Sequence, residues 1–148
     1  MDVKHVENAV KNLNYFGGIF FVKHLKYIKI ISYPVAFIFY DKKHYISVYI
    51  TSKKVEVMDS SGYLNSSAFD RQFRKLLNVH IYNKKFMATP KLQSNNSNAC
   101  SLYAICFLYF RTITHQSLCK FCKLFTSDFD LNCLIISDLF DTITKLKE

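Results

Sequence analysis

A polar loop followed by a long apolar segment constrains the fold of this chain most. Residues 93–111 read QSNNSNACSLYAICFLYFR, in which a run of Ser and Asn ends and almost every following residue is apolar. The segment predicts a buried helix that begins at Cys100, with Ser97 or Asn98 as N-cap and Arg111 at its negative C-terminal end. Because the N-terminal end of a helix favours thiolate over thiol, Cys100 is a candidate nucleophile. The alternative is a buried structural cysteine, which behaves as a small hydrophobe.

The composition indicates a folded globular chain in which residues 1–148 form a single domain. Half of the residues are hydrophobic, and there are only 3 Gly and 2 Pro, which excludes a disordered chain. The longest apolar runs, of about ten residues, are too short to span a bilayer, and no leader sequence opens the chain. We therefore expect no membrane association, and a monomer is favoured.

The charge indicates an acidic partner. Twenty Lys and Arg face 11 Asp and Glu, which gives a net charge of +9, and nucleic acid is the commonest acidic partner. Because lysines are scattered over almost every segment, such binding should be diffuse and non-specific. Alternatively, surface lysine only keeps a hydrophobic chain in solution.

The cysteines indicate the compartment. All five lie in the last third of the chain, and their odd number predicts free thiols in an intracellular, reducing environment.

Hydrophobic periodicity predicts an α+β chain with a mixed or antiparallel sheet. Apolar residues at helical spacing predict helices over 3–13, 68–78 and 131–148, with a short one within 115–125. Apolar runs and strict alternation predict strands over 35–40, 44–51 and 55–59, with one more between 80 and 90. The first of these strands is apolar on both faces and should be central in the sheet. The conformation of residues 19–31 is left open.

The second and third predicted strands should form a hairpin. If Ser52 and Lys53 make a two-residue loop, paired positions sum to 105. Asp59 then lies on the same face as His44, one diagonal step away, at a Cα separation of roughly 7 Å. A register slip of one residue would separate the two side chains. The sequence therefore predicts a histidine–carboxylate pair at the open end of this hairpin.

Four residues then supply the parts needed for nucleophilic attack on a peptide carbonyl. Cys100 is the candidate nucleophile, His44 the general base, and Asp59 the group that orients the base. The Gln93 side-chain amide and the Cys100 backbone N–H would form the oxyanion hole, each donor lowering the barrier by roughly 3 kcal/mol.

The order His44, Asp59, Gln93 and Cys100, followed by an apolar helix, resembles the adenovirus-protease (adenain) and Ulp/SENP clan of cysteine proteases. The resemblance covers residues 6–111. The opening VENAVKNLNYFGGIF is similar to the adenain N-terminus, and QSNNSNACSLYAICFLYF is similar to its Gln-to-Cys block. Gln stands seven residues before Cys, as in the adenain branch, whereas six is usual in the SUMO-protease branch. VMDSSG, with Ser after the Asp, is closer to the SUMO proteases.

This chain departs from the family pattern at two positions. Tyr45 follows the histidine where the family usually has Trp, so an aromatic side chain is kept. Ser101 follows the cysteine where Gly usually leaves room near the substrate. The chain also has fewer residues after Arg111 than adenain, which continues through several more helices.

The resemblance implies a papain-like, adenain-type fold, with a mixed sheet packed between helices and the catalytic cysteine at the N-terminus of a central helix. It implies a cysteine endopeptidase of virion maturation that cuts viral precursor proteins after small residues such as Gly, in the virion and the host nucleus. No cofactor is required for the chemistry, although DNA and an activating peptide stimulate adenain-like enzymes.

Three alternatives remain open. The chain could be a SUMO or ubiquitin-like deconjugating protease, or a catalytically inactive DNA-binding virion protein of the same fold. The third is a zinc site, for which the ligands would be His115, Cys119, Cys122 and Cys133. We disfavour zinc and predict no metal ligands, because the three cysteines lie among core-type apolar residues.

Overall fold

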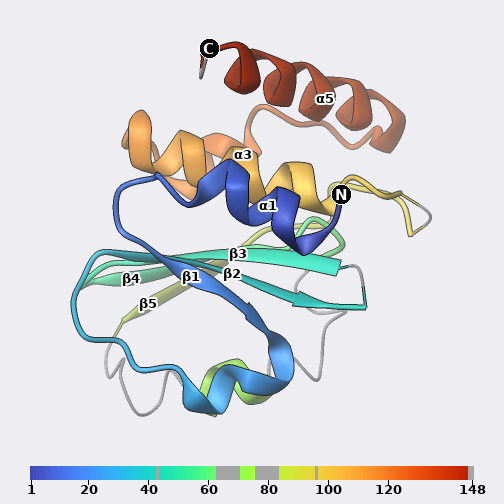
Figure 1. The fold of residues 1–148 in the computed structure, drawn as a ribbon. Helices are drawn as coiled ribbons and strands as arrows, with labels where there is room; N and C mark the ends of the chain where they lie inside the picture. The colour runs from blue at the N-terminus through green and yellow to red at the C-terminus, as the bar shows by residue number, and fades with distance from the viewer. Residues whose placement is uncertain (43, 63–70, 76–83, 96, 147–148) are drawn as a thin grey trace.

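A computed structural model of the chain describes residues 1–42, 44–62, 71–75, 84–95 and 97–146. They form an α+β fold around one mixed five-stranded sheet, as the sequence predicts (Figure 1). The elements, in chain order, are α1 (Val3–Val10), β1 (Phe16–Phe21), the 3-10 helix η1 (Val22–Tyr27), β2 (Val35–Asp41), β3 (His44–Ile50), β4 (Lys54–Met58), β5 (Lys85–Ala88), α3 (Cys100–Ile113), α4 (Leu118–Cys122) and α5 (Phe129–Leu146).

The sheet follows chain order, β1-β2-β3-β4-β5. Both outer pairs, β1 with β2 and β4 with β5, are parallel, and the inner pairs are antiparallel. Strand β2, predicted to be central, has a neighbour on each side and its residues 36–39 are buried, although the middle strand of the sheet is β3. The segment 19–31, for which the sequence pattern predicts no definite conformation, contains the end of β1 and all of η1.

The predicted hairpin register is confirmed. Ile50 pairs with Val55 and Val48 with Val57, and both pairs of positions sum to 105. The Thr51 hydroxyl closes the turn, because its Oγ1 accepts hydrogen bonds from the backbone N–H groups of residues 53 and 54. This register brings the residue after β4 to the start of β3.

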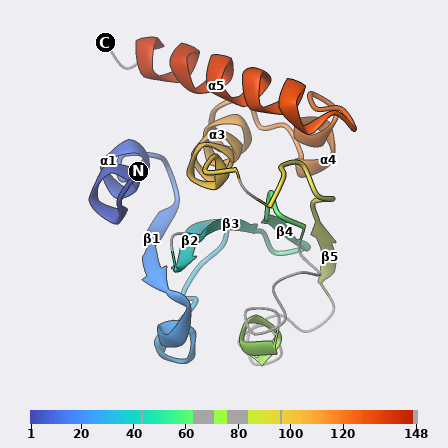
Figure 2. The same cartoon turned by 90° about the vertical axis from the view of Figure 1, so that its right-hand side faces the viewer.

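Helices cover both faces of the sheet (Figure 2). On one face, α3 lies between the sheet and α5, with α1 beside it. Residues of α3 contact an extensive apolar core on this side, which is why nearly every position of the helix is apolar. The other face packs against η1 and the helical residues 71–75 through a second apolar cluster. The central position of the Cys100 helix follows from its apolar surface on all sides.

Several predicted boundaries are wrong by a few residues. Helix α1 ends at Val10 instead of continuing to residue 13, and α5 begins earlier than predicted, at Phe129. Asp128 explains the second difference, because its Oδ1 accepts from the first-turn backbone N–H groups of residues 130 and 131. Of the helix predicted over 68–78, only residues 71–75 are described, and they are helical. The short helix predicted within 115–125 is α4.

Arg111 lies in the last turn of its helix, as the sequence predicts. Helix α3 continues to Ile113, and Arg111 turns back to the sheet, where its Nε lies 2.7 Å from Glu56 Oε1. Glu56 is fully buried on β4, and its other oxygen accepts from the backbone N–H of Leu118 at 2.6 Å. A buried carboxylate needs such partners. The ion pair therefore fixes α3 against β4, and the hydrogen bond from Leu118 fixes α4 there.

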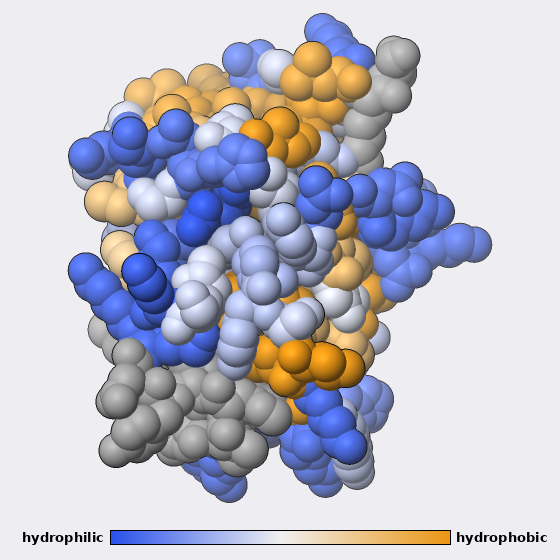
Figure 3. Space-filling view, turned by 90° about the vertical axis from the view of Figure 1, so that its left-hand side faces the viewer, coloured by the Kyte–Doolittle hydropathy of each residue, from blue (hydrophilic) through white to orange (hydrophobic). Residues whose placement is uncertain are grey.

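The helical layer carries an apolar groove of about 150 Å³ between the C-terminal halves of α3 and α5. Figure 3, which views the molecule from the left-hand side of Figure 1, shows apolar side chains gathered along the upper edge, the side on which Figure 1 places α5. Ile113 and Leu146 lie at the groove with most of their surface exposed. In the described part of the chain, no helix is both long enough and apolar enough to cross a membrane.

Candidate active site

Three elements bring His44, Asp59 and Cys100 together. His44 is the first residue of β3, Asp59 directly follows β4, and Cys100 is the first residue of α3. His44 Nε2 lies 2.9 Å from Asp59 Oδ1, and the ring also hydrogen-bonds the Cys100 side chain. Because Nε2 faces the carboxylate, Nδ1 is the ring nitrogen left for the thiol. Sulfur, imidazole and carboxylate thus lie in the order that a nucleophile, its base and an orienting acid require.

Asp59 is held rigidly at the base of this arrangement. The residue is fully buried, and its Oδ1 also accepts from the backbone N–H and the hydroxyl of Ser61, at 3.1 Å and 2.8 Å. Thr89 Oγ1 accepts from the Asp59 backbone N–H and donates to its carbonyl oxygen. Both the main chain and the carboxylate of Asp59 are therefore fixed. The Ser61 hydroxyl also lies 3.3 Å from His44 Nε2.

The electrostatics of the pair favour charge separation. Burial alone would lower the pKa of His44, but its hydrogen bonds to Asp59 and Cys100 outweigh burial and raise the pKa to about 10. Burial alone would raise the pKa of Cys100, but the hydrogen bond to His44 and the backbone N–H groups of Tyr45 and Ser101 lower it. The two protonation states are coupled, since each charge stabilises the other. The arrangement therefore shifts the pair toward thiolate and imidazolium.

The predicted N-cap is wrong, and the difference bears on the sulfur. Ala99 occupies the N-cap position of α3 and offers no side-chain acceptor. Ser97 Oγ accepts from the Ala99 backbone N–H at 3.2 Å, before the helix starts. The N-cap residue therefore makes no side-chain hydrogen bond to the first turn. The Ser101 N–H is one of the groups that stabilise the Cys100 thiolate instead.

Gln93 is connected to this site through Ser60. Its side chain is buried, and its Oε1 accepts from the Ser60 hydroxyl at 2.9 Å. Its backbone N–H donates to the Ser60 carbonyl at 3.1 Å. With the amide oxygen committed to Ser60, the Nε2 group is the end left to donate to a ligand. The structure thus links the predicted oxyanion donor to the strand end that carries Asp59.

The sequence interpretation missed four supporting residues. Ser60, Ser61 and Thr89 fix the orienting acid and the amide, and Asn132 of α5 donates from Nδ2 to the Leu92 carbonyl at 3.0 Å, directly before Gln93. The signal for two of them was the tripeptide DSS at the end of β4, where polar side chains follow a buried strand. Nothing in the sequence pattern indicated Thr89 or Asn132.

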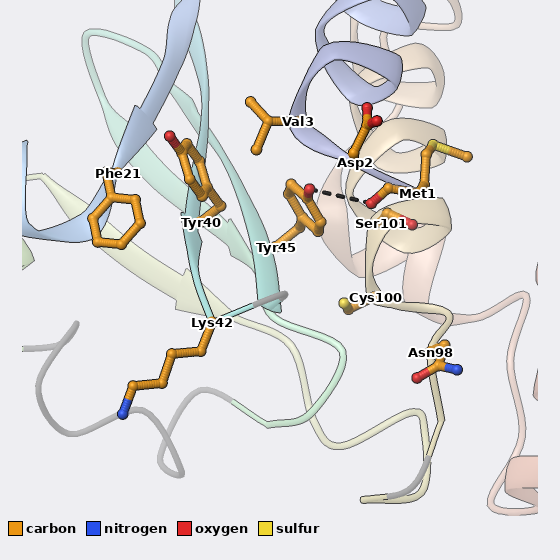
Figure 4. Close-up of a pocket in the computed structure, with 10 residues that line it drawn as sticks. All are labelled: Met1, Asp2, Val3, Phe21, Tyr40, Lys42, Tyr45, Asn98, Cys100 and Ser101. Atoms are coloured by element: carbon orange, nitrogen blue, oxygen red, sulfur yellow. Dashed lines mark hydrogen bonds between the residues drawn. The ribbon is translucent and has the colours of Figure 1, made fainter.

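A cleft of about 640 Å³ opens beside the sulfur (Figure 4). Cys100, Ser101 and Asn98 lie on one side of it, and Figure 4 shows Tyr45, Tyr40 and Phe21 on the other. Lys42 and the first three residues of the chain complete the lining, and the Tyr45 hydroxyl donates to the Met1 carbonyl at 3.3 Å. Tyr45 therefore presents an aromatic wall, and Ser101 occupies the position beside the nucleophile.

The remaining cysteines have ordinary structural surroundings. No disulfide joins any of the five cysteines, all of which lie among the described residues. Burial raises the pKa of Cys106 to about 12 and the pKa of Cys122 to about 11. Cys119 and Cys133 are exposed. Among the described residues, no three His, Cys, Asp or Glu side chains are grouped so that they could hold a metal ion, so the zinc alternative has no geometric support.

Comparison with known proteins shows a likeness in fold. No family model and no curated protein matches the chain. A solved structure described as the central domain of the uncharacterized Lpg1148 protein from Legionella pneumophila is similar, with a TM-score of 0.54 and 8% sequence identity. The match covers 94% of this chain and 96% of that chain. The likeness concerns the α+β fold alone.

Proposed function

We propose that this chain is a cysteine endopeptidase of the adenain and Ulp/SENP type. The observation that carries the proposal is the contact of one imidazole, His44, with both a buried carboxylate and the thiol at the start of α3. A mixed sheet packed between helices, with this cysteine on the central helix, supports an adenain-type fold. The spacing of seven residues between Gln93 and Cys100 supports the adenain branch.

The geometry suits acyl transfer in two steps. The Cys100 thiolate attacks the peptide carbonyl carbon, and the carbonyl electron pair moves onto oxygen, where the Cys100 N–H and the Gln93 amide would stabilise it. The tetrahedral intermediate collapses as the carbon–nitrogen bond breaks, and protonated His44 gives its proton to the leaving amine. Neutral His44 then takes a proton from water, whose oxygen attacks the thioester. Collapse releases the carboxylic acid and returns the sulfur as thiolate and His44 as imidazolium.

The same proposal gives the biological setting. The substrates would be viral precursor proteins, cut after small residues such as Gly during maturation in the virion and the host nucleus. The net charge of +9 supports DNA as a non-specific partner. An activating peptide belongs to this proposal as well. Monomeric action is expected, since the candidate residues all come from one chain.

A second candidate is a SUMO or ubiquitin-like deconjugating protease. The motif VMDSSG, with Ser60 after the acid, is closer to the SUMO proteases and favours this candidate. Ser60 also donates a hydrogen bond to the side-chain oxygen of Gln93, the candidate oxyanion donor. The two candidates share their chemistry and differ in substrate. The non-enzymatic alternative, a DNA-binding virion protein, would leave the Cys100 thiol unused.

The test uses the full chain with three substrates: a peptide panel containing Gly, a Gly-Gly conjugate of a ubiquitin-like protein, and a viral capsid precursor. We expect cleavage by the wild type and none by Cys100→Ala, with products identified by mass spectrometry. Cleavage of the conjugate alone would select the deconjugase. DNA binding by a wild type that cleaves nothing and whose Cys100 resists alkylation would contradict protease function.

A further inference from the structure

A continuous row of aromatic rings leads away from the cleft. Starting beside Cys100, the row consists of Tyr45, Tyr40, Phe21, His24 and Tyr27. Its successive ring centroids are 6.1, 4.9, 6.1 and 6.3 Å apart. Figure 4 shows its first three members side by side, from the sulfur outward. We call this set the aromatic row. It joins the cleft to the surface of η1, where Tyr27 is 71% exposed.

Lysines accompany the row along its length. Lys42 lines the cleft itself and is exposed. The ammonium group of Lys23 lies 4.9 Å from the Phe21 ring centroid, and that of Lys26 lies 5.1 Å from the Tyr27 ring centroid. Both lysines are exposed. The surface therefore combines apolar ring area with three cations in reach of solvent.

Negative charge is scarce on this surface. Residues 19–42 include four lysines but one acid, Asp41. At the cleft end lies Asp2, whose Oδ1 already accepts from the backbone N–H and the ring of His5 at the start of α1. The row is thus complementary to a ligand that carries carboxylates and apolar side chains.

We propose that the aromatic row binds an extended acidic segment of the polypeptide substrate, joined directly to the residue that is cleaved. The proposal rests on the proposed protease function, since it makes the row a continuation of the substrate cleft. The four centroid separations set an upper limit on the length of the row, which at ~3.3 Å per residue is at most roughly seven residues of extended chain. Acidic side chains would reach the lysines while apolar ones contact the rings.

The ring geometry favours a polypeptide over single-stranded nucleic acid. Base stacking requires open ring faces. Here Phe21 and Tyr40 meet edge to face, with planes at 87°, and Lys23 lies over the Phe21 ring. Such an arrangement offers edges and methylene groups to a ligand, which suit a peptide backbone with alternating side chains.

The test measures binding separately from cleavage. The probe is a fluorescent peptide of about eight residues in which Glu alternates with Leu and Phe, and the comparison peptide has Gln in place of Glu. Anisotropy titrations use Cys100→Ala protein, so that turnover plays no part. We expect the Glu peptide to bind about tenfold more tightly than the Gln peptide. This preference should shrink as salt rises from about 0.05 M to 0.5 M.

Matched charge reversals locate the site. The variant Lys23→Glu/Lys26→Glu/Lys42→Glu should lose the preference for the Glu peptide. The control Lys53→Glu/Lys120→Glu/Lys123→Glu changes the net charge equally at exposed lysines elsewhere and should keep it. Equal binding of the two peptides, or equal losses in both variants, would overturn the proposal. So would displacement by a thymidine oligonucleotide at a concentration where the unlabelled Glu peptide fails.

Cleavage separates this proposal from the protease proposal. In wild-type protein, an acidic flank added to a cleavable peptide should lower KM about tenfold and leave kcat unchanged. Peptide binding without any cleavage would contradict protease function and with it the assignment of the row to a substrate. If neither the acidic flank nor reversal of the three lysines changes KM or kcat, the aromatic row does not bind substrate, and the protease proposal is unaffected.

Discussion

The start and the middle of α3 each carry a buried cysteine, and their surroundings give them opposite chemistry. Cys100 is 6% exposed and Cys106 is 1% exposed. Burial raises the pKa of Cys106 to about 12, whereas the hydrogen bond from His44 and the backbone N–H groups of Tyr45 and Ser101 lower the pKa of Cys100. Burial by itself therefore makes a thiol inert. The neighbours that a helix start and a strand end bring to the sulfur make it a candidate nucleophile.

The largest expected effect is on the nucleophile. Cys100→Ala should lower peptide cleavage to background, a loss of about 10⁵-fold or more, because no thioester can form. The matched variant Cys106→Ala should keep full kcat and lose only about 1 kcal/mol in the free energy of unfolding. Fluorogenic peptide assays and urea unfolding of both variants test this pair. Cleavage by Cys100→Ala at the wild-type rate would remove the distinction between the two cysteines.

The next largest effect concerns His44, whose contact with Cys100 makes the chemistry of this thiol differ from that of Cys106. His44→Ala should abolish cleavage and lower the rate of Cys100 alkylation at pH 6.5 to about a hundredth, since an unassisted thiol is mostly protonated there. His115→Asn, a change at an exposed histidine, is the control and should alter neither rate. Undiminished alkylation in His44→Ala would show that the helix start alone activates the sulfur.

The third effect concerns Gln93, which is expected to act on the oxyanion and not on the sulfur. Gln93→Ala should lower kcat by about 10² to 10³, because one of two donors to the developing charge is removed. Alkylation of Cys100 should stay at the wild-type rate, since an alkyl halide forms no oxyanion. Gln116→Ala, in the loop before α4, serves as control. If kcat and the rate of Cys100 alkylation fell by the same factor, Gln93 would act by positioning or activating the Cys100 sulfur and not by stabilising the oxyanion.

The smallest expected effect is at Ser60, which fixes the Gln93 amide from the end of β4. Ser60→Ala should lower kcat about tenfold with little change in KM, because the Gln93 amide oxygen loses the hydrogen bond that the Ser60 hydroxyl donates to it. Ser47→Ala is the matched control: this serine is equally buried, and its hydroxyl has no hydrogen-bond partner within the described residues. Equal kcat values for the two variants would exclude a positioning role for Ser60.

The sequence predicted most of the fold and the central contact of the site. The alternation over residues 44–51 and the turn at Ser52 set the hairpin register, and that register placed Asp59 beside His44. These are local rules of strand pairing, which sequence spacing expresses directly. The start of the apolar helix likewise identified Cys100. The contact between the helix and the hairpin came from the family resemblance, since no local pattern relates positions 44 and 100.

The tertiary supports of the site could not be predicted. Thr89, Asn132 and the buried Glu56 act through partners that are 30, 40 and 55 positions away along the chain, so periodicity carries no signal for them. The cap at residues 97–99 was predicted wrongly for a similar reason, because the path of the preceding loop decides which residue takes the N-cap position. The roles assigned to the four candidate residues remain predictions.

The pairing of Cys100 with His44 can be tested by the pH dependence of alkylation at each cysteine of one wild-type sample, read by peptide mass spectrometry after brief iodoacetamide treatment. Cys119 and Cys133 are exposed and serve as exposed references, and Cys106, which is buried like Cys100, serves as the buried reference. We predict that Cys100 reacts at lower pH than the two exposed cysteines, that its rate is level above its lowered pKa, and that this level holds until His44 loses its proton near pH 10. A Cys100 that reacts no faster at pH 6 than the two exposed references would contradict this prediction.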